Sequence, residues 1–435
     1  MKMNNLGLEW NIINFSTVFS YEKRSMIGRF QDLRELYAAH ELYLLNHAGP
    51  YIDEDVFRYV EEVYPQFMPV IRIIEGGSIR PFDTINKSWG WVPSIFRRFV
   101  SEVLQIVSKH PRFYDTMSQA WKGSFKIPNL IRFLSFSQKD LRFPTETLIN
   151  AMRSTTGLGY FEPSRGVKYR TSATNSAVLF LATLSPGALS SLRKIVLHED
   201  HESTCWPESH AQNLIPVCRN NPDLRVEQRV DLWRNVWPAS AGPVTEIMGL
   251  SRTQLERERL DFMPSDNITR SHLAPWIMET LTLPSLGMPP QSFHLVLDGG
   301  PDPKLTTDAF EIVQRDASWQ RAFEEHGAEH KVIQRSSESQ YMMLKKSFIL
   351  YGFPQAMHDI TEKSSPMISC NFDIGPSWDI APLQERSRAW SWYDWEEYWH
   401  DHQPKGFEPE LPLPDWIDIR REAILLEDGF IENDW

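Results

Sequence analysis

The chain has 435 residues, of which 41% are hydrophobic and 23% are charged, so it is long enough for two or three globular domains. Its net charge is −12, but residues 392–435 hold thirteen acidic against three basic residues, which leaves the rest of the chain nearly neutral. A nearly neutral body with an acidic tail argues against a nucleic-acid-binding protein, because phosphate neutralisation requires clustered Lys and Arg. Bulk charge therefore predicts no nucleic-acid partner.

Cysteine usage and hydropathy bear on the cell compartment. Cys205, Cys218 and Cys370 show no C-x-x-C spacing and leave an odd thiol, which favours a reducing compartment over a disulfide framework. The first residues lack the apolar segment of a secretory signal, and no apolar run approaches the roughly 20 residues of a membrane span. We expect a cytoplasmic or nuclear protein that is not secreted and has no membrane partner.

Residues 1–150 are predicted to form a mainly helical region. Apolar residues recur there at helical spacing, and the expected helices lie at 22–46, 53–64, 93–109, 127–136 and 145–152. Acidic residues begin the second of these helices, and Pro93 lies in the first turn of the third, where a proline is tolerated. These apolar stripes indicate packing between helices more strongly than a cofactor site.

Residues 165–375 are predicted to form an α/β domain, so that the fold class is α/β, or α+β for the whole chain. The expected strands lie at 168–173, 192–197, 224–233, 292–297 and 367–372. The expected helices lie at 175–184, 272–283, 306–325 and 354–362. Alternating strands and helices predict mainly parallel pairing. The three central strands begin about one and then two units of ~33 residues apart, which suggests a leucine-rich-repeat-like solenoid, with an open sheet as the alternative.

Local signals predict where individual helices begin and end. Ser209 and Gln212 have the spacing of a capping box, and Pro216 would kink that helix or begin its second part. Thr306 or Thr307 is the expected N-cap of the longest helix, and Gly327 its expected closing residue.

Several motifs of this chain resemble a lineage-restricted, largely uncharacterised family of filamentous-fungal proteins. They are L-R-K-I-V-L-H-E-D (192–200), E-S-H-A-Q-N-L-I-P-V-C-R (208–219), M-P-P-x-S-F-x-L-V-L-D-G (288–299), F-E-I-V-Q-R-D-A-S-W-Q (310–320) and C-N-F-D (370–373). Proteins of this group are compared with F-box-like proteins that carry a degenerate repeat domain. The resemblance covers about half the chain and implies a source and a fold, but no catalytic role.

An F-box would require a short helical motif that starts with Leu-Pro near the N-terminus. The nearest candidate is I-P-N-L-I at 127–131, followed by Asp140 and Leu141. It lies far from the N-terminus and lacks the acidic residue that usually follows the proline. A motif this weak leaves an F-box-like adaptor as one interpretation of the chain among others.

The densest cluster of metal-ligand residue types follows the strand at 192–197. His198, His201 and His210 are the candidate ligands, together with acidic neighbours and Cys205, and imidazole and thiolate favour zinc. The H-E-D-H-E run differs from the helical H-E-x-x-H motif, because its histidines are three apart and follow a strand. A solvated loop is the alternative interpretation. No other cofactor is predicted.

Enzyme signatures are otherwise lacking. The sequence has no G-x-S-x-G elbow, phosphate-binding loop or kinase motif set, while a Ser/His/Asp triad assembled by folding is left open. If the strands are parallel, the loops at His198 and at Asp298-Gly299-Gly300 share the carboxyl edge of the sheet, where ligands of open α/β sheets bind.

The C-terminal region, residues 376–435, is acidic and rich in tryptophan. Trp392, Trp395 and Trp399 are spaced to share one helical face, and Trp416 follows in a proline-marked segment. Aromatic residues among negative charges suit an apolar groove with a basic rim, and this groove could belong to a partner protein or to the body of the same chain.

Three functions are consistent with these observations. The first is a non-enzymatic protein-interaction module with a protein partner, such as an F-box-like adaptor. The second is an accessory enzyme of fungal specialised metabolism, with its site at the strand-end loops around His198 and Asp298. The third is a transcription-associated factor that uses the acidic aromatic tail.

Overall fold

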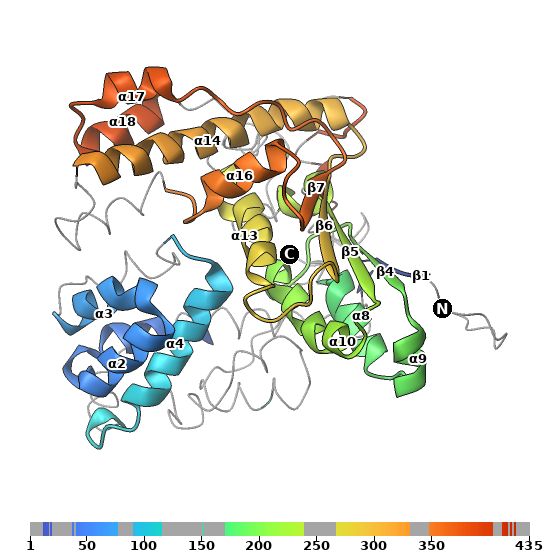
Figure 1. Cartoon of the computed structure of the whole chain (residues 1–435), viewed down its shortest axis with the longest axis horizontal. Coiled ribbons are helices and arrows are strands. Elements are labelled where there is room, and N and C mark those ends of the chain that lie inside the picture. The colour runs from blue at the N-terminus through green and yellow to red at the C-terminus, as the bar shows by residue number, and fades with distance from the viewer. Residues whose placement is uncertain are drawn as a thin grey trace, which may run out of the picture.

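A computed structural model describes residues 12–16, 18–19, 37–38, 41–76, 90–114, 150, 170–238, 267–330, 348–402, 411–415, 418–419 and 422. It has the mixed α/β class that the sequence predicts, in which a helical N-terminal region precedes a parallel sheet with interleaved helices (Figure 1). Among the described residues, no helix is both long enough and apolar enough to cross a membrane.

The main sheet has five parallel strands whose spatial order is their order in the chain. They are β1 (Ile12–Ser16), β4 (Lys194–Glu199), β5 (Arg225–Asp231), β6 (Phe293–Asp298) and β7 (Ile368–Cys370). A short antiparallel pair joins β2 (Val18–Phe19) to β3 (Arg170–Thr171). Strand β1 was not predicted. It brings the N-terminal segment into the same sheet as residues more than a hundred positions later.

The described N-terminal helices are amphipathic and pack on one another. They are α2 (Glu54–Val63), α3 (Met68–Glu75) and α4 (Pro93–Val107). The side chain of Asp53 accepts hydrogen bonds from the backbone of Asp55 and Val56, which satisfies free N–H groups at the start of α2. Helix α3 was not predicted. Residues 127–136 and 145–149 of the predicted helices lie outside the described residues.

The helices of the α/β region follow the strands in turn. They are α8 (Ala173–Leu181), α9 (Pro186–Ser191), η4 (Pro207–Leu214), α10 (Ile215–Asn220), α13 (Ala274–Thr282), α14 (Pro303–His330) and α16 (Phe353–Thr361). Two further helices, α17 (Ala381–Ser387) and α18 (Trp392–Asp401), follow the last strand. Short irregular helices occupy Leu232–Val236 (η5) and Asn267–Leu273 (η7).

Three predicted helix signals are wrong. Ser209 lies inside η4 and donates its hydroxyl to the carbonyl of Trp206, so it does not form a capping box with Gln212. The start of α14 is instead capped by Asp302, whose side chain accepts from Leu305, because α14 begins three residues before Thr306. Gly327 lies within α14 and does not end it. Pro216 does begin a second helix, α10.

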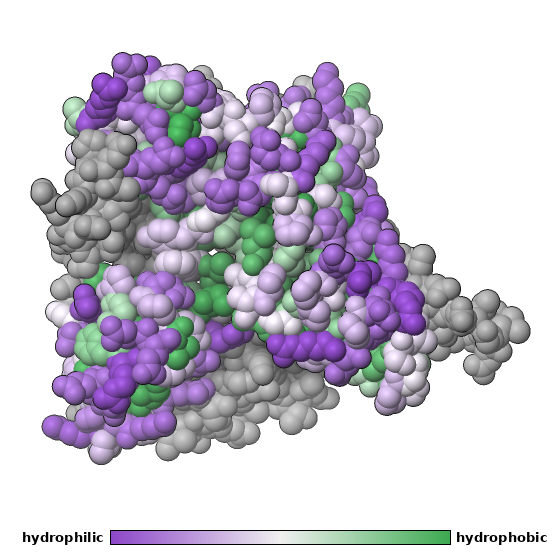
Figure 2. All heavy atoms as spheres, viewed as in Figure 1, coloured by the Kyte–Doolittle hydropathy of each residue, from purple (hydrophilic) through white to green (hydrophobic). Residues whose placement is uncertain are grey.

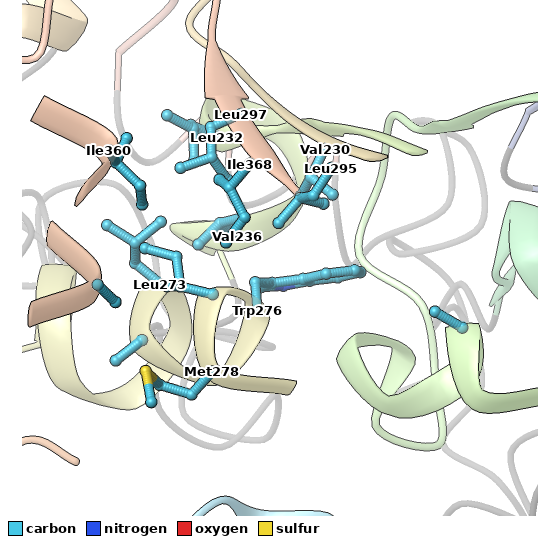
Figure 3. Close-up of a cluster of buried hydrophobic side chains, with 14 of the residues drawn as sticks. Val230, Leu232, Val236, Leu273, Trp276, Met278, Leu295, Leu297, Ile360 and Ile368 are labelled. Carbon is cyan, nitrogen blue, oxygen red and sulfur yellow. The ribbon is translucent and has the colours of Figure 1, made fainter. Parts of the chain in front are cut away.

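Two hydrophobic cores hold the described residues together. The first lies between the sheet and its helices; Figure 3 shows Val230, Leu295 and Leu297 from the strands close to Trp276 and Leu273. The second joins the N-terminal helices to the far half of α14 and to α18. Figure 2 shows hydrophobic residues gathered in the middle of this view, between the N-terminal helices and α14.

The contact between the N-terminal helices and the segment before α16 is direct. The rings of Trp91 and Tyr351 have centroids 4.6 Å apart, and the backbone N–H of Tyr351 donates to the carbonyl of Gly90 at 2.6 Å. Burial of two large rings supplies apolar area that a short helical region could not bury alone.

Candidate protein-interaction surface

Alternate side chains of the central strands face two different environments. In β5, Val226, Gln228 and Val230 are buried, whereas the residues between them are exposed or partly exposed. In β6 the same alternation places Phe293, Leu295 and Leu297 in the core. Strands of a parallel sheet with helices on both faces are apolar nearly throughout, so the alternation in β5 and β6 indicates that the described helices lie on one face. Strand β4 departs from this pattern, because Val196 is buried as well as Ile195 and Leu197.

The strand order explains why the described helices lie on one face of the sheet. Each connection between the five strands moves to the next position in the same direction. Parallel crossover connections are almost always right-handed, so connections that all move one way place their helices on the same face. A doubly wound sheet, by contrast, reverses direction in the middle and so covers both faces.

We call the side of the sheet on which no described helix packs the open face. Its residues follow from the strand register, which aligns Lys194 with Arg225, Val196 with Glu227 and His294, and His198 with Arg229, Val296 and Ser369. Asp231 and Asp298 are aligned in the last row, at the carboxyl ends of their strands. Charged and polar residues thus dominate a surface that rigid strands present.

Ion pairs fix the centre of the open face. Nζ of Lys194 lies 2.7 Å from one carboxylate oxygen of Glu227, and Nε of Arg229 lies 2.6 Å from the other. Burial alone would raise the pKa of Glu227, but the hydrogen bonds from both cations outweigh it and lower the pKa. The side chains of Lys194 and Arg229 remain 40% and 41% exposed, so their outer ends can still meet a partner.

The carboxyl edge of the sheet carries the aspartates. Asn371 donates its side-chain amide to Asp298 at 2.7 Å and accepts the backbone N–H of Gly299 at 2.9 Å. Burial raises the pKa of Asp231 to about 6, and the nearby charge of Asp298 acts in the same direction. The strands are parallel, so the ends of β4 and β6 share this edge as the sequence predicts, with β5 between them; Asp231 of β5 was not singled out in the sequence.

The three histidines predicted to bind zinc lie in three different environments. His198 lies on the open face of β4. His201 has Nδ1 3.4 Å from Asp200 and Nε2 3.8 Å from Glu422. His210 is fully buried in η4. Within the described part of the chain, no group of three or more His, Cys, Asp or Glu side chains could hold a metal ion.

His210 instead belongs to a buried polar network that was not predicted. Its Nδ1 lies 2.7 Å from the hydroxyl of Ser172, and its Nε2 lies 2.7 Å from the carbonyl of Cys205. Because Nε2 faces a carbonyl and must donate, Nδ1 accepts from Ser172. The Ser172 hydroxyl in turn caps α8 by accepting from the backbone of Asn175. Serine and histidine are both fully buried, so this pair is inaccessible to a substrate.

A buried glutamate follows at the end of β4. The Glu199 carboxylate accepts the backbone N–H groups of Ala173 and Thr174, at 2.9 and 3.0 Å, at the start of α8. The Thr174 hydroxyl and the Gln228 amide also donate to it. Burial raises the pKa of Glu199, whereas these four hydrogen bonds act in the opposite direction. Glu199 thus links two strands to the positive end of a helix.

A second buried glutamate links the N-terminal helices to the α/β region. Glu279 of α13 accepts the backbone N–H of Ser94 at 2.8 Å and the Ser94 hydroxyl at 2.6 Å, at the start of α4. Gln212 of η4 donates to the same carboxylate. Neither glutamate could be found from local sequence, because each partner lies at least 25 positions away.

Two of the tryptophans that were predicted to share a helical face pack against their own chain. Trp395 and Trp399 are only 1% and 3% exposed, and both meet Trp319 of α14 edge to face, with centroid distances of 5.3 and 4.8 Å. The guanidinium of Arg315 lies over the Trp399 ring at 4.7 Å. The side chain of Trp392 and the whole of Trp416 lie outside the described residues. In this conformation, Trp395 and Trp399 are covered by α14, whereas Trp378 of the same region is 52% exposed.

No family model, curated protein or solved structure matches this chain. Function is therefore argued from the surfaces of the molecule itself.

Proposed function

We propose that this protein is a non-enzymatic protein-interaction module that binds a partner protein through the open face of its sheet, in the cytoplasm or nucleus of a filamentous fungus. The observation that carries the proposal is the alternation in β5 and β6, which gives the parallel sheet a charged face on which none of the described helices packs. A rigid surface of fixed charges favours a protein partner, because little side-chain order is lost on binding.

The resemblance to F-box-like proteins suggests a more specific role, in which the protein is an adaptor and the open face binds its substrate protein. In an adaptor of that kind, a repeat-like domain would hold the substrate protein while the F-box contacts the ubiquitin ligase. The candidate F-box at 127–141 lies outside the described residues, so its support is the sequence motif alone.

The test is co-purification from a filamentous-fungal lysate followed by mass spectrometry. The bait is the full chain, compared with a variant that carries Lys194→Ala and Arg229→Ala on the open face. The matched control carries Arg58→Ala and Arg321→Ala, since both arginines are more than half exposed and lie on helices away from the sheet. Partners lost from the first variant alone support the proposal, and an unchanged set of partners contradicts it.

A second candidate function is an enzyme with its site at the carboxyl edge of the sheet. It is favoured by Asp231, whose pKa of about 6 lies close to neutral pH, where a general acid or base is most effective. Asp298 is its register neighbour and would supply the second carboxylate. Turnover of a small molecule that is lost in both Asp231→Asn and Asp298→Asn, with partner binding unchanged, would favour this candidate over the interaction module.

A further inference from the structure

The charges of the open face alternate along the strand direction. Strand β5 places Arg225, Glu227, Arg229 and Asp231 on this face in that order, so its signs are plus, minus, plus, minus. The first and last members of the series have opposite signs, and so do the two central members. This series is therefore complementary to its own reverse.

This pattern restricts how two copies of the face can meet. If a second sheet packs on the first with its strands antiparallel, Arg225 meets Asp231 of the second copy and Glu227 meets Arg229 of the second copy. Both contacts recur in reverse, as a two-fold axis requires. If the strands are parallel, each charge on β5 meets its own kind. Charge complementarity thus selects one arrangement and opposes the other.

We propose that this protein forms a homodimer in which the open faces of two sheets pack together, with antiparallel strands, about a two-fold axis that crosses β5. The proposal rests on the proposed function and names its partner as a second copy of the chain. The neighbouring strands fit the same axis. On β4, His198 lies opposite Val196 of the second copy, and on β6, His294 lies opposite Val296 of the second copy, so neither strand places like charges together.

The long cations have the reach that this contact needs. Packed sheets lie about 10 Å apart, so pairs across the interface must be made by extended side chains. Within the chain, Arg229 uses Nε for Glu227, and its side chain is 41% exposed, so its two Nη groups can serve as donors to a partner. Glu227 can accept from several donors, because a carboxylate has about four lone-pair positions.

The dimer is expected to be weak. The patch of four strands covers roughly 400 Å² in outline, from a strand spacing of about 4.8 Å and a rise of about 3.3 Å per residue. Stable interfaces bury about 800 Å² on each partner, and charges at such a contact must lose water. We therefore expect a dissociation constant on the order of micromolar or weaker, which rises with salt.

Charge reversal at the centre of the face tests the arrangement directly. In Glu227→Arg, four arginines would meet at the axis, and in Arg229→Glu, four glutamates would meet. Each single variant is therefore expected to dimerise at least tenfold more weakly than the natural chain in sedimentation velocity. An equimolar mixture of the two variants is expected to form a heterodimer, because each supplies the charge that the other lacks.

The double variant Glu227→Arg with Arg229→Glu serves as the matched control. It exchanges the two central charges of β5, and the resulting series is still complementary to its own reverse. This variant is therefore expected to dimerise within a few-fold of the natural chain. Circular dichroism verifies that all the variants fold. Both side chains are partly exposed, so their replacement leaves the core intact.

Two results would overturn the proposal. One is a natural chain that stays monomeric at the highest soluble concentration, and the other is a mixture of the single variants that does not associate. The proposed function is tested separately. If partners from a lysate still depend on Lys194 and Arg229 while no dimer forms, the face binds a different protein and only the homodimer is wrong.

Discussion

Replacement of Trp395 by alanine should release α18 from α14. The indole is 1% exposed and has ring centroids 5.3 Å from Trp319, 5.4 Å from Phe323 and 5.2 Å from Trp390. A buried tryptophan removes about 150–250 Å² from water, which is about 4–6 kcal/mol at ~25 cal/mol per Å². Observed losses for such truncations are about 3–5 kcal/mol, so we expect about 4 kcal/mol.

The assay is hydrogen exchange of peptides from α18, read by mass spectrometry. A loss of about 4 kcal/mol corresponds to opening that is roughly a thousandfold more frequent, up to the limit at which α18 is fully undocked. The conservative variant Trp395→Phe keeps part of the apolar contact and is expected to fall between alanine and the natural chain.

Tyr393 provides the matched control on the same helix. It is 58% exposed, so Tyr393→Ala should change the free energy of docking by less than about 0.5 kcal/mol. Equal exchange in Trp395→Ala and Tyr393→Ala would refute the reasoning. It would mean that α18 is undocked in solution, with its tryptophans available to a partner protein.

Three further predictions concern one partly buried aspartate and two buried polar groups. Asp231→Asn should stabilise the protein above about pH 6 by on the order of 1–3 kcal/mol and have little effect near pH 4, measured by urea unfolding across pH. The folded state keeps the proton of Asp231 up to about pH 6, whereas the unfolded state loses it near pH 3.8. The stability of the natural chain therefore falls as pH rises from about 3.8 to about 6. A stability difference between Asp231→Asn and the natural chain that does not change with pH would contradict this reasoning. Glu199→Gln should lower the free energy of unfolding by about 2 kcal/mol, because the amide places an N–H donor against the N–H groups at the start of α8. The control Glu311→Gln, at an exposed position, should be nearly neutral. Equal shifts of the melting temperature in the two variants would contradict the proposed role of the Glu199 network. Ser172 should resist a fluorophosphonate probe in the native protein, and labelling that is lost in Ser172→Ala would reveal an accessible nucleophile.

Periodicity predicted the elements of the α/β region well, because their apolar patterns match the environment in which they fold. Strand β6 was expected at 292–297 and lies at Phe293–Asp298, since its alternation is regular and a glycine pair follows. Helix α14 was expected to be shorter, because Thr306 and Gly327 carry signals that mark a helix end elsewhere. Here, Asp302 caps the first turn, and Gly327 is buried within the helix.

The polar contacts of the candidate surface could not be predicted from local sequence patterns. The pairing of Lys194 with Glu227 depends on strand register, and register follows from packing of the whole sheet. The three histidines near 200 illustrate the same limit. They are close in sequence, but they lie in three different environments, because His198 is on a strand, His201 is in a loop and His210 is in a buried helix.

The pairing of β1 with β4 has a consequence for how the chain folds. Ile12 is made before the helical region, whereas its partner Lys194 follows only after that region. Contacts of such long sequence separation slow folding, because a large loop must close before they form. During synthesis, β1 therefore has no partner until β4 has been made, and its free edges can meanwhile pair with other chains. An N-terminal fusion or truncation that disturbs β1 should accordingly lower the yield of native protein and promote aggregation, even though it leaves the open face intact.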